Sequence, residues 1–160
     1  IGLIEGEVWM DASRDRLKGY RQALANAEIL FDPDLVRPGN WEPSAGYEQT
    51  HALMNLKDPP TAIFCANDLM ALGCYEALKE VGKRIPEDVA VIGYDDREIA
   101  QFTRPPLTTV LLPHFEMGTL AAEYLVNNPV QLKGRQSQIK VECPLVERSS
   151  VGPIVPDQLD

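Results

Sequence analysis

The sequence lacks long apolar runs, an excess of basic residues and any cluster of cysteines. No stretch approaches the roughly 18 uninterrupted apolar residues of a membrane-spanning helix, which argues against such a helix. The 15 lysines and arginines are outnumbered by 24 acidic residues, which gives a net charge of −9. Because nucleic-acid affinity comes mainly from Lys and Arg, we expect no direct contact of this chain with DNA or RNA.

Signatures of metal, cofactor and catalytic chemistry are also missing. The three cysteines, Cys65, Cys74 and Cys143, are an odd number and lack the C-x-x-C spacing of a metal site. Two of them lie in apolar patterns, which favours buried free thiols in a reducing compartment. The sequence has no G-x-G-x-x-G, Walker or H-E-x-x-H motif, and no spacing pairs a nucleophile with a base. We therefore expect a binding module with no catalytic residues, no metal and no cofactor.

The chain does contain short apolar runs that alternate with helical patterns, in an ordinary globular composition of 44% hydrophobic and 24% charged residues. Strands are predicted at residues 1–4, 35–36, 61–66, 89–93, 107–111 and 139–146. Helices are predicted from a cap at Asp11 or Ser13 to about residue 27, from Pro43 to before Asp58, and from a cap at Asn67 or Asp68 to Gly82. A short helix is predicted over 97–102. The last predicted helix ends at Asn127-Asn128-Pro129 and has Leu120, Ala121, Tyr124 and Leu125 on its inward face. This alternation predicts an α/β fold with a doubly wound, mostly parallel sheet.

The first residues do not resemble a natural start. Residues 1–4 already have the pattern of a buried strand, and no basic segment or longer apolar core of a signal peptide is present. We expect the chain to be an internal piece of a longer protein. The polar segment after Ser150 is predicted to be a poorly ordered tail.

Four polar or aromatic residues fall near the predicted carboxyl ends of strands or the starts of helices, where open α/β sheets bind ligands: Arg16, Trp41, Asn67 and Asp95. Together they suit a polyhydroxylated ligand. An indole stacks on the apolar face of a sugar or base, Asp accepts hydroxyl hydrogen bonds, and Arg and Asn donate to oxygens. Hydrogen bonds to charged groups are about twice as strong as neutral ones.

Each candidate also has a purely structural interpretation. Arg16 fits an exposed, solvated helix position, and Trp41 fits the core. Asn67 fits a helix N-cap, and Asp95 fits a cap for the short helix at 97–102, although Asp96 is better placed for that cap.

Three long motifs bear on the choice between these interpretations. Residues 60–73 (PTAIFCANDLMALG), 85–96 (IPEDVAVIGYDD) and 105–110 (PPLTTV) resemble the effector-binding core of the lac/gal repressor family of bacterial transcription regulators. Residues 16–20, 39–41 and 145–149 add weaker support. The resemblance covers nearly all of residues 1–150.

The resemblance implies a fold like that of periplasmic binding proteins, in which two α/β subdomains are joined by three crossing strands around a ligand cleft. On this basis residues 1–103 form most of the C-terminal subdomain, and 104–136 form a crossover strand and helix of the N-terminal subdomain. Residues 137–150 return to the first subdomain, and 151–160 are the tail. The helix-turn-helix domain and most of the N-terminal subdomain are absent from this chain, which is a fragment of the two-subdomain fold.

The resemblance also implies roles for the candidate residues. Arg16 matches the family's ligand-binding arginine, Trp41 its stacking aromatic residue, Asn67 an asparagine that contacts sugar hydroxyls in some members, and Asp95 the aspartate at the cleft floor. His114, near the crossover, is a further candidate contact. Met10 and Ala12 stand where the purine-responsive member carries Arg and Thr, which favours a sugar over a purine.

The resemblance therefore implies the effector-sensing part of a cytoplasmic, sugar-responsive repressor that is not an enzyme and not a membrane protein. Cleft closure would change operator affinity through the helix-turn-helix domain of a homodimer or tetramer. The alternative is a periplasmic sugar-binding protein of a transporter, which shares the fold. A third hypothesis is a small sugar hydrolase that uses Asp95 or Asp96.

Overall fold

The computed structural model describes residues 1–127 and 138–152. The predicted helix end at Asn128-Pro129 and most of the predicted tail lie outside these residues. None of the helices in the described parts is long and apolar enough to cross a membrane.

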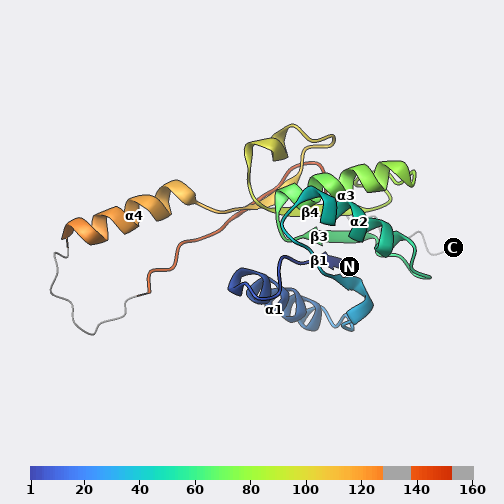
Figure 1. Cartoon of the computed structure of the whole chain (residues 1–160), viewed down its shortest axis with the longest axis horizontal. Coiled ribbons are helices and arrows are strands. Elements are labelled where there is room, and N and C mark those ends of the chain that lie inside the picture. The colour runs from blue at the N-terminus through green and yellow to red at the C-terminus, as the bar shows by residue number, and fades with distance from the viewer. Residues whose placement is uncertain (128–137, 153–160) are drawn as a thin grey trace.

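The strands form one twisted sheet of six (Figure 1). They are β1 (Gly2–Ile4), β2 (Val36–Arg37), β3 (Ala62–Cys65), β4 (Ala90–Asp95), β5 (Thr108–Leu111) and β6 (Leu145–Val146), in the order β2-β1-β3-β4-β5-β6. The first five strands are parallel, and β6 pairs antiparallel with β5. The predicted fold class is thereby confirmed.

Helices cover both faces of the sheet. The helices are α1 (Asp11–Asn26), α2 (Pro43–Met54), α3 (Asp68–Glu80) and α4 (His114–Asn127), with short 3₁₀ helices η1 (Pro33–Leu35) and η2 (Glu98–Gln101). Figure 1 shows α1 on one side of the sheet and α2 and α3 on the other. Leu3 packs with Tyr20 and Leu24 of α1, whereas its neighbour Ile4 belongs to the larger core with α2 and α3. Alternate residues of β1 thus serve opposite cores.

Local signals account for most of the helix ends. The Asn67 side chain accepts a hydrogen bond from the backbone N–H of Met70, as the predicted cap of α3 requires, and Gly82 follows the helix with φ +71°. The predicted cap of α1 is wrong, because Met10 occupies the N-cap position and makes no side-chain hydrogen bond there. Ser13 is instead buried, and its hydroxyl donates to the carbonyl oxygen of Gly6 at 3.0 Å.

The segment after β5 leaves the sheet, and α4 extends away from the rest of the chain (Figure 1). None of the side chains of α4 is buried, and Phe115, Leu125 and Val126 are 75–81% exposed. The predicted inward face of this helix, formed by Leu120, Ala121, Tyr124 and Leu125, therefore has no buried residue within the described part of the chain. The predicted strand over 139–146 reduces to the two residues of β6, because only they pair with β5.

Two of the three cysteines are buried free thiols, as predicted. Cys65 of β3 and Cys74 of α3 are fully buried in the larger core, whereas Cys143 is exposed. A hydrogen bond with Cys74 and burial together raise the pKa of the Cys65 thiol well above its ordinary value.

Candidate ligand-binding site

The strand order places a topological switch point at the carboxyl ends of the central strands, where open α/β sheets have their ligand-binding crevice. β1 lies between β2 and β3, so the chain leaves β1 towards one side of the sheet and later returns on the other. Helices then depart from opposite faces at this point, and open α/β sheets bind ligands in the gap between them. Arg16 of α1 reaches across it, and its Nη1 donates to the carbonyl oxygen of Ala66 beyond β3 at 2.8 Å.

Arg16 brings three of the predicted site residues together. Its Nη2 atom lies 3.7 Å from Oδ1 of Asp95, and both side chains are only 15–16% exposed. Its guanidinium carbon lies 5.4 Å from the centroid of the Trp41 ring and 3.8 Å from that of Tyr94. Cation–π contact of this kind holds the guanidinium between two aromatic residues. Arg16 is therefore no freely solvated surface residue.

Asp95 ends β4 between two positive charges. Nε of Arg97 lies 3.8 Å from its Oδ2 atom, opposite the contact with Arg16. Burial raises the pKa of the Asp95 carboxyl above its ordinary value, whereas Arg16 and Arg97 lower it. His114, the exposed first residue of α4, is near enough for its charge to lower this pKa as well. The Asp95 carboxylate thus offers a charged hydrogen-bond acceptor at the carboxyl end of β4.

Trp41 lies partly buried against the core, with one side of its indole over Gly6. A Cβ atom on Gly6 would overlap three atoms of the indole ring, so only glycine fits beneath it. The indole N–H is 3.1 Å from the sulfur of Met10. The core interpretation of Trp41 thus describes part of its surroundings, and its stacking on a ligand stays a prediction.

Asn67 uses both ends of its amide within the protein. Its Oδ1 atom caps α3, and its Nδ2 donates to the carbonyl oxygen of Trp41 at 2.9 Å. The side chain is buried, so it fixes the position of the loop that carries Trp41. A contact between Asn67 and a ligand stays a prediction.

Three residues of this region were not anticipated from sequence. The Tyr94 ring lies against the Arg16 guanidinium, and Asp68 and Arg148 bind the turn that follows Asp95. The predicted Asp96 cap is wrong, because η2 has Arg97 at its N-cap position and no capping side chain. Asp96 instead accepts a hydrogen bond from Nη2 of Arg148 at 2.7 Å. Tyr94 could have been predicted from the alternation of side chains along β4. Because adjacent strand residues point to opposite faces, Tyr94 lies on the face opposite to that of buried Gly93.

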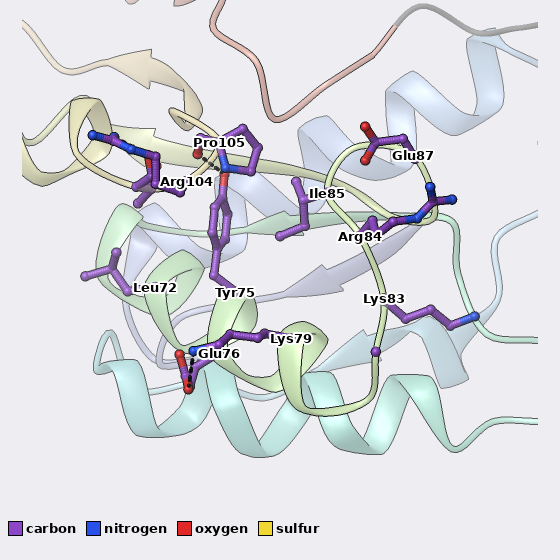
Figure 2. A pocket seen from close by; sticks show the side chains of 12 residues that line it. Leu72, Tyr75, Glu76, Lys79, Lys83, Arg84, Ile85, Glu87, Arg104 and Pro105 are labelled. Carbon is purple, nitrogen blue, oxygen red and sulfur yellow. Dashed lines mark hydrogen bonds and ion pairs between the residues drawn. The ribbon is translucent and has the colours of Figure 1, made fainter.

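A pocket lies elsewhere on the molecule. Figure 2 shows a pocket of about 830 Å³ along the outer side of α3, bounded by Tyr75, Lys79 and Arg104 and by the loop after the helix. The Tyr75 hydroxyl donates to the carbonyl oxygen of Pro105 at 3.1 Å, and burial helps raise the pKa of Tyr75 to about 12. None of the residues that line this pocket belongs to the group around Arg16.

The parallel, doubly wound sheet and the polar and aromatic residues gathered at its switch point are typical of an α/β ligand-binding domain. Residues 1–151 match the family described as the periplasmic binding protein-like domain. The chain belongs to this family.

Its relatives are transcriptional repressors. The chain is 39% identical over 158 residues to the HTH-type transcriptional repressor PurR of Haemophilus influenzae (strain PittEE), which covers 97% of this chain and 47% of that protein. A CelR–cellobiose complex has a TM-score of 0.85 at 36% identity, covering 93% of this chain and 46% of that one. The lac repressor dimer bound to operator and the anti-inducer ONPF has a TM-score of 0.82 at 32% identity, and the match covers 94% of this chain and 51% of that one.

The predicted resemblance to the lac/gal repressor family is thereby confirmed. The chain spans about half the length of the curated relatives that it matches.

Proposed function

We propose that this chain is the effector-binding part of a bacterial transcriptional repressor and that its effector is a sugar. One observation carries the proposal: Arg16, Trp41 and Asp95, which are distant in sequence, meet at the switch point of the sheet. They supply a charged donor, an aromatic surface and a charged acceptor. Similarity to repressors over 97% of the chain supports the same conclusion.

The chemistry of the crevice favours hydroxyl groups as the ligand's polar atoms. The Asp95 carboxylate accepts two hydroxyl hydrogen bonds, and Arg16 donates to ring or hydroxyl oxygens. Met10, the N-cap residue of α1, contacts the indole N–H through its sulfur, and Ala12 in the first turn of α1 is apolar, so these two positions offer no strong donor to a purine. The complex of CelR with cellobiose gives this assignment a precedent at 36% identity. Asn67 and His114 complete the proposed contacts.

We further propose that residues 1–103 and 137–150 form one subdomain and that 104–136 belong to a second, with 151–160 as a tail. The support is the position of α4, none of whose residues is buried in the described part of the chain and whose Phe115, Leu125 and Val126 side chains are 75–81% exposed. A second subdomain packed on this helix would close over the crevice from the side of His114. The remainder of that subdomain and a helix-turn-helix domain would lie upstream of Ile1.

The mechanism would be a population shift between an open and a closed cleft. A sugar held by residues of both subdomains binds the closed form more tightly and therefore favours it. Closure changes how the DNA-binding domains meet an operator, so effector and operator affinities are coupled reciprocally. The acidic chain described here would not itself contact DNA. Such a repressor acts in the cytoplasm.

A homodimer, or a tetramer of two such dimers, fits the outer side of α3. The 830 Å³ pocket and a second hollow of about 320 Å³ between α2 and α3 share Leu72 and Glu76, so they form one continuous face. Carboxylates and ammonium groups alternate on it, including Glu76 and Lys79, which lie 3.4 Å apart. A face that carries both charges is complementary to itself, as a two-fold interface requires.

Isothermal titration of the intact protein tests the effector assignment. The probes are D-glucose, D-ribose, cellobiose, cytidine and hypoxanthine, and we expect binding by one of the three sugars. Asp95→Asn is expected to weaken that binding about 10- to 100-fold, because a hydrogen bond to a charged group is lost. The matched control Asp15→Asn changes an exposed carboxylate of α1 and should leave the affinity unchanged. Tight binding of hypoxanthine with no binding of any sugar would overturn the sugar assignment.

The two rival functions predict different results. A hydrolase would release product from a sugar probe, and Asp95→Asn would abolish that turnover; the repressor predicts no turnover by either protein. A transporter component would carry a signal peptide upstream of Ile1, where the repressor carries a helix-turn-helix.

A further inference from the structure

Asp68 is a fully buried carboxylate outside the proposed ligand contacts. It is the first residue of α3, and its two oxygens accept hydrogen bonds from different elements. Oδ2 accepts from the backbone N–H of Arg97 at 2.7 Å, and Oδ1 accepts from the hydroxyl of Thr109 on β5 at 2.6 Å. A buried carboxylate would be costly unless such donors satisfied it.

The turn that Asp68 contacts has an unfavourable backbone. Asp95 has φ 107° and Asp96 has φ 50°, so two consecutive residues with side chains lie at positive φ. Residues other than glycine adopt this region rarely, and they persist there only when the surrounding structure holds them. Asp95 is also the residue that faces Arg16 across the crevice.

Asp68 is bound to the backbone directly after the strained residues. The N–H of Arg97 donates to it, and the N–H of Asp96 lies 3.4 Å from the Thr109 hydroxyl that itself donates to Asp68. Two successive backbone N–H groups are therefore tied, directly or through one hydroxyl, to a single carboxylate. The opposite side of the turn is held by the ion pair between Asp96 and Arg148, at 2.7 Å.

We propose that Asp68 is a positioning residue of the effector site, which acts by holding the turn at residues 95–97 so that the Asp95 carboxylate faces Arg16. Asp68 touches no ligand itself. The inference rests on the proposed function, because it assigns a role within the same site. Without Asp68 the turn relaxes towards negative φ, and the Asp95 side chain rotates away from the crevice.

Two variants remove the constraint in different ways. Asp68→Asn keeps the shape of the side chain but removes its charge and one of its acceptors. Thr109→Val removes only the hydroxyl that links Asp68 to the N–H of Asp96, and it serves as the second variant where Asp68→Asn fails to fold. Thr109→Ser retains that hydroxyl and is the matched control. Leu53→Ala in α2 is a destabilising core control distant from the turn.

The first measurement is hydrogen–deuterium exchange of the intact protein, which needs no ligand. We expect the amides of Asp96 and Arg97 to exchange on the order of tenfold faster in Asp68→Asn and in Thr109→Val, because hydrogen bonds that protect them are lost. They should be unchanged in Thr109→Ser and Leu53→Ala. The second measurement titrates the same proteins with the sugar of the probe set that binds most tightly. Asp68→Asn and Thr109→Val should bind it about tenfold more weakly, and the two controls should bind it normally.

Unchanged exchange at residues 96 and 97 in both variants would overturn the inference. So would faster exchange with normal sugar affinity, or an equal loss of affinity in Leu53→Ala. Should no probe bind the unaltered protein, the proposed function fails, while exchange still decides whether Asp68 holds the turn.

Discussion

Replacement of Gly6 by Ala is expected to displace the Trp41 indole and weaken effector binding without unfolding the protein. A Cβ atom at this position would lie closer to three indole atoms than the 3.0 Å below which real Cβ atoms are essentially never found. The ring must retreat by roughly 1 Å or more to restore a van der Waals separation of ~3.5 Å. It cannot retreat freely, because its N–H contacts Met10 and its backbone carbonyl accepts a hydrogen bond from Asn67.

The loss of stacking should reduce binding by ~1–3 kcal/mol, or about 5- to 150-fold in Kd. Overpacking should lower the free energy of unfolding by a similar ~1–3 kcal/mol. Isothermal titration of the intact protein with the sugar that it binds gives the first quantity. Tryptophan emission reports the environment of Trp41 in a background where it is the sole tryptophan. Within this sequence that background requires Trp9→Phe, since Trp9 is 69% exposed and would otherwise contribute solvent-exposed signal.

The matched control is Gly19→Ala on the exposed side of α1, where an added Cβ would meet nothing within 4 Å. This variant should bind normally and gain ~0.5–1 kcal/mol of stability, because Ala is the better helix former. The reasoning is refuted if Gly6→Ala keeps its Kd within about twofold and its emission does not shift, because the indole would then lie elsewhere or contribute nothing.

Four further predictions concern the proposed ligand contacts, the proposed dimer face and one surface ion pair. Trp41→Ala should weaken sugar binding by ~1–3 kcal/mol in titration, and an unchanged affinity would make Trp41 a core residue only. Asp95→Asn should weaken sugar binding about 10- to 100-fold in titration, and neither the unaltered protein nor the variant should turn the sugar over. Turnover that disappears in the variant would favour a hydrolase. Leu72→Arg should shift the intact protein from dimer to monomer in light scattering, whereas an unchanged mass would place the interface elsewhere. The hydrogen bonds and charge of Arg84 lower the pKa of Asp88 to about 2, so this pair stabilises the fold above the ordinary value of 3.8 and loses its effect as pH falls towards about 2. In Arg84→Ala the pKa of this carboxyl should rise above 2 in an NMR titration but stay below 3.8, because the backbone N–H of residue 84 still donates to Asp88; a midpoint still near 2 would assign the shift to another group.

The features that could be predicted from sequence are those set by neighbouring residues. The cap at Asn67 acts on an N–H three residues away, and Pro43 begins α2 because a proline fits the first helical turn. A continuous apolar run such as residues 61–66 is typical of a strand covered on both faces, and β3 lies in the middle of the sheet. The resemblance then brought together residues that no local pattern links.

The features that could not be predicted depend on distant partners. Ser13 was expected to cap α1, but its hydroxyl has an acceptor at Gly6 in the loop before the helix. Asp96 was expected to cap η2, but Arg148 lies beside it although 52 residues separate the two in sequence. Asp68 was noticed only as an alternative helix cap, because its donors, Arg97 and Thr109, become neighbours only when β4 and β5 pair.

A crystal structure of the intact protein with the most tightly bound sugar tests the central claim most directly. The account predicts that the sugar ring lies against the Trp41 indole, with its hydroxyl groups on the Asp95 carboxylate and the Arg16 guanidinium. A second subdomain that includes α4 should close over it from the side of His114. A sugar bound at any other place, with the Arg16–Asp95 crevice empty, would contradict the account.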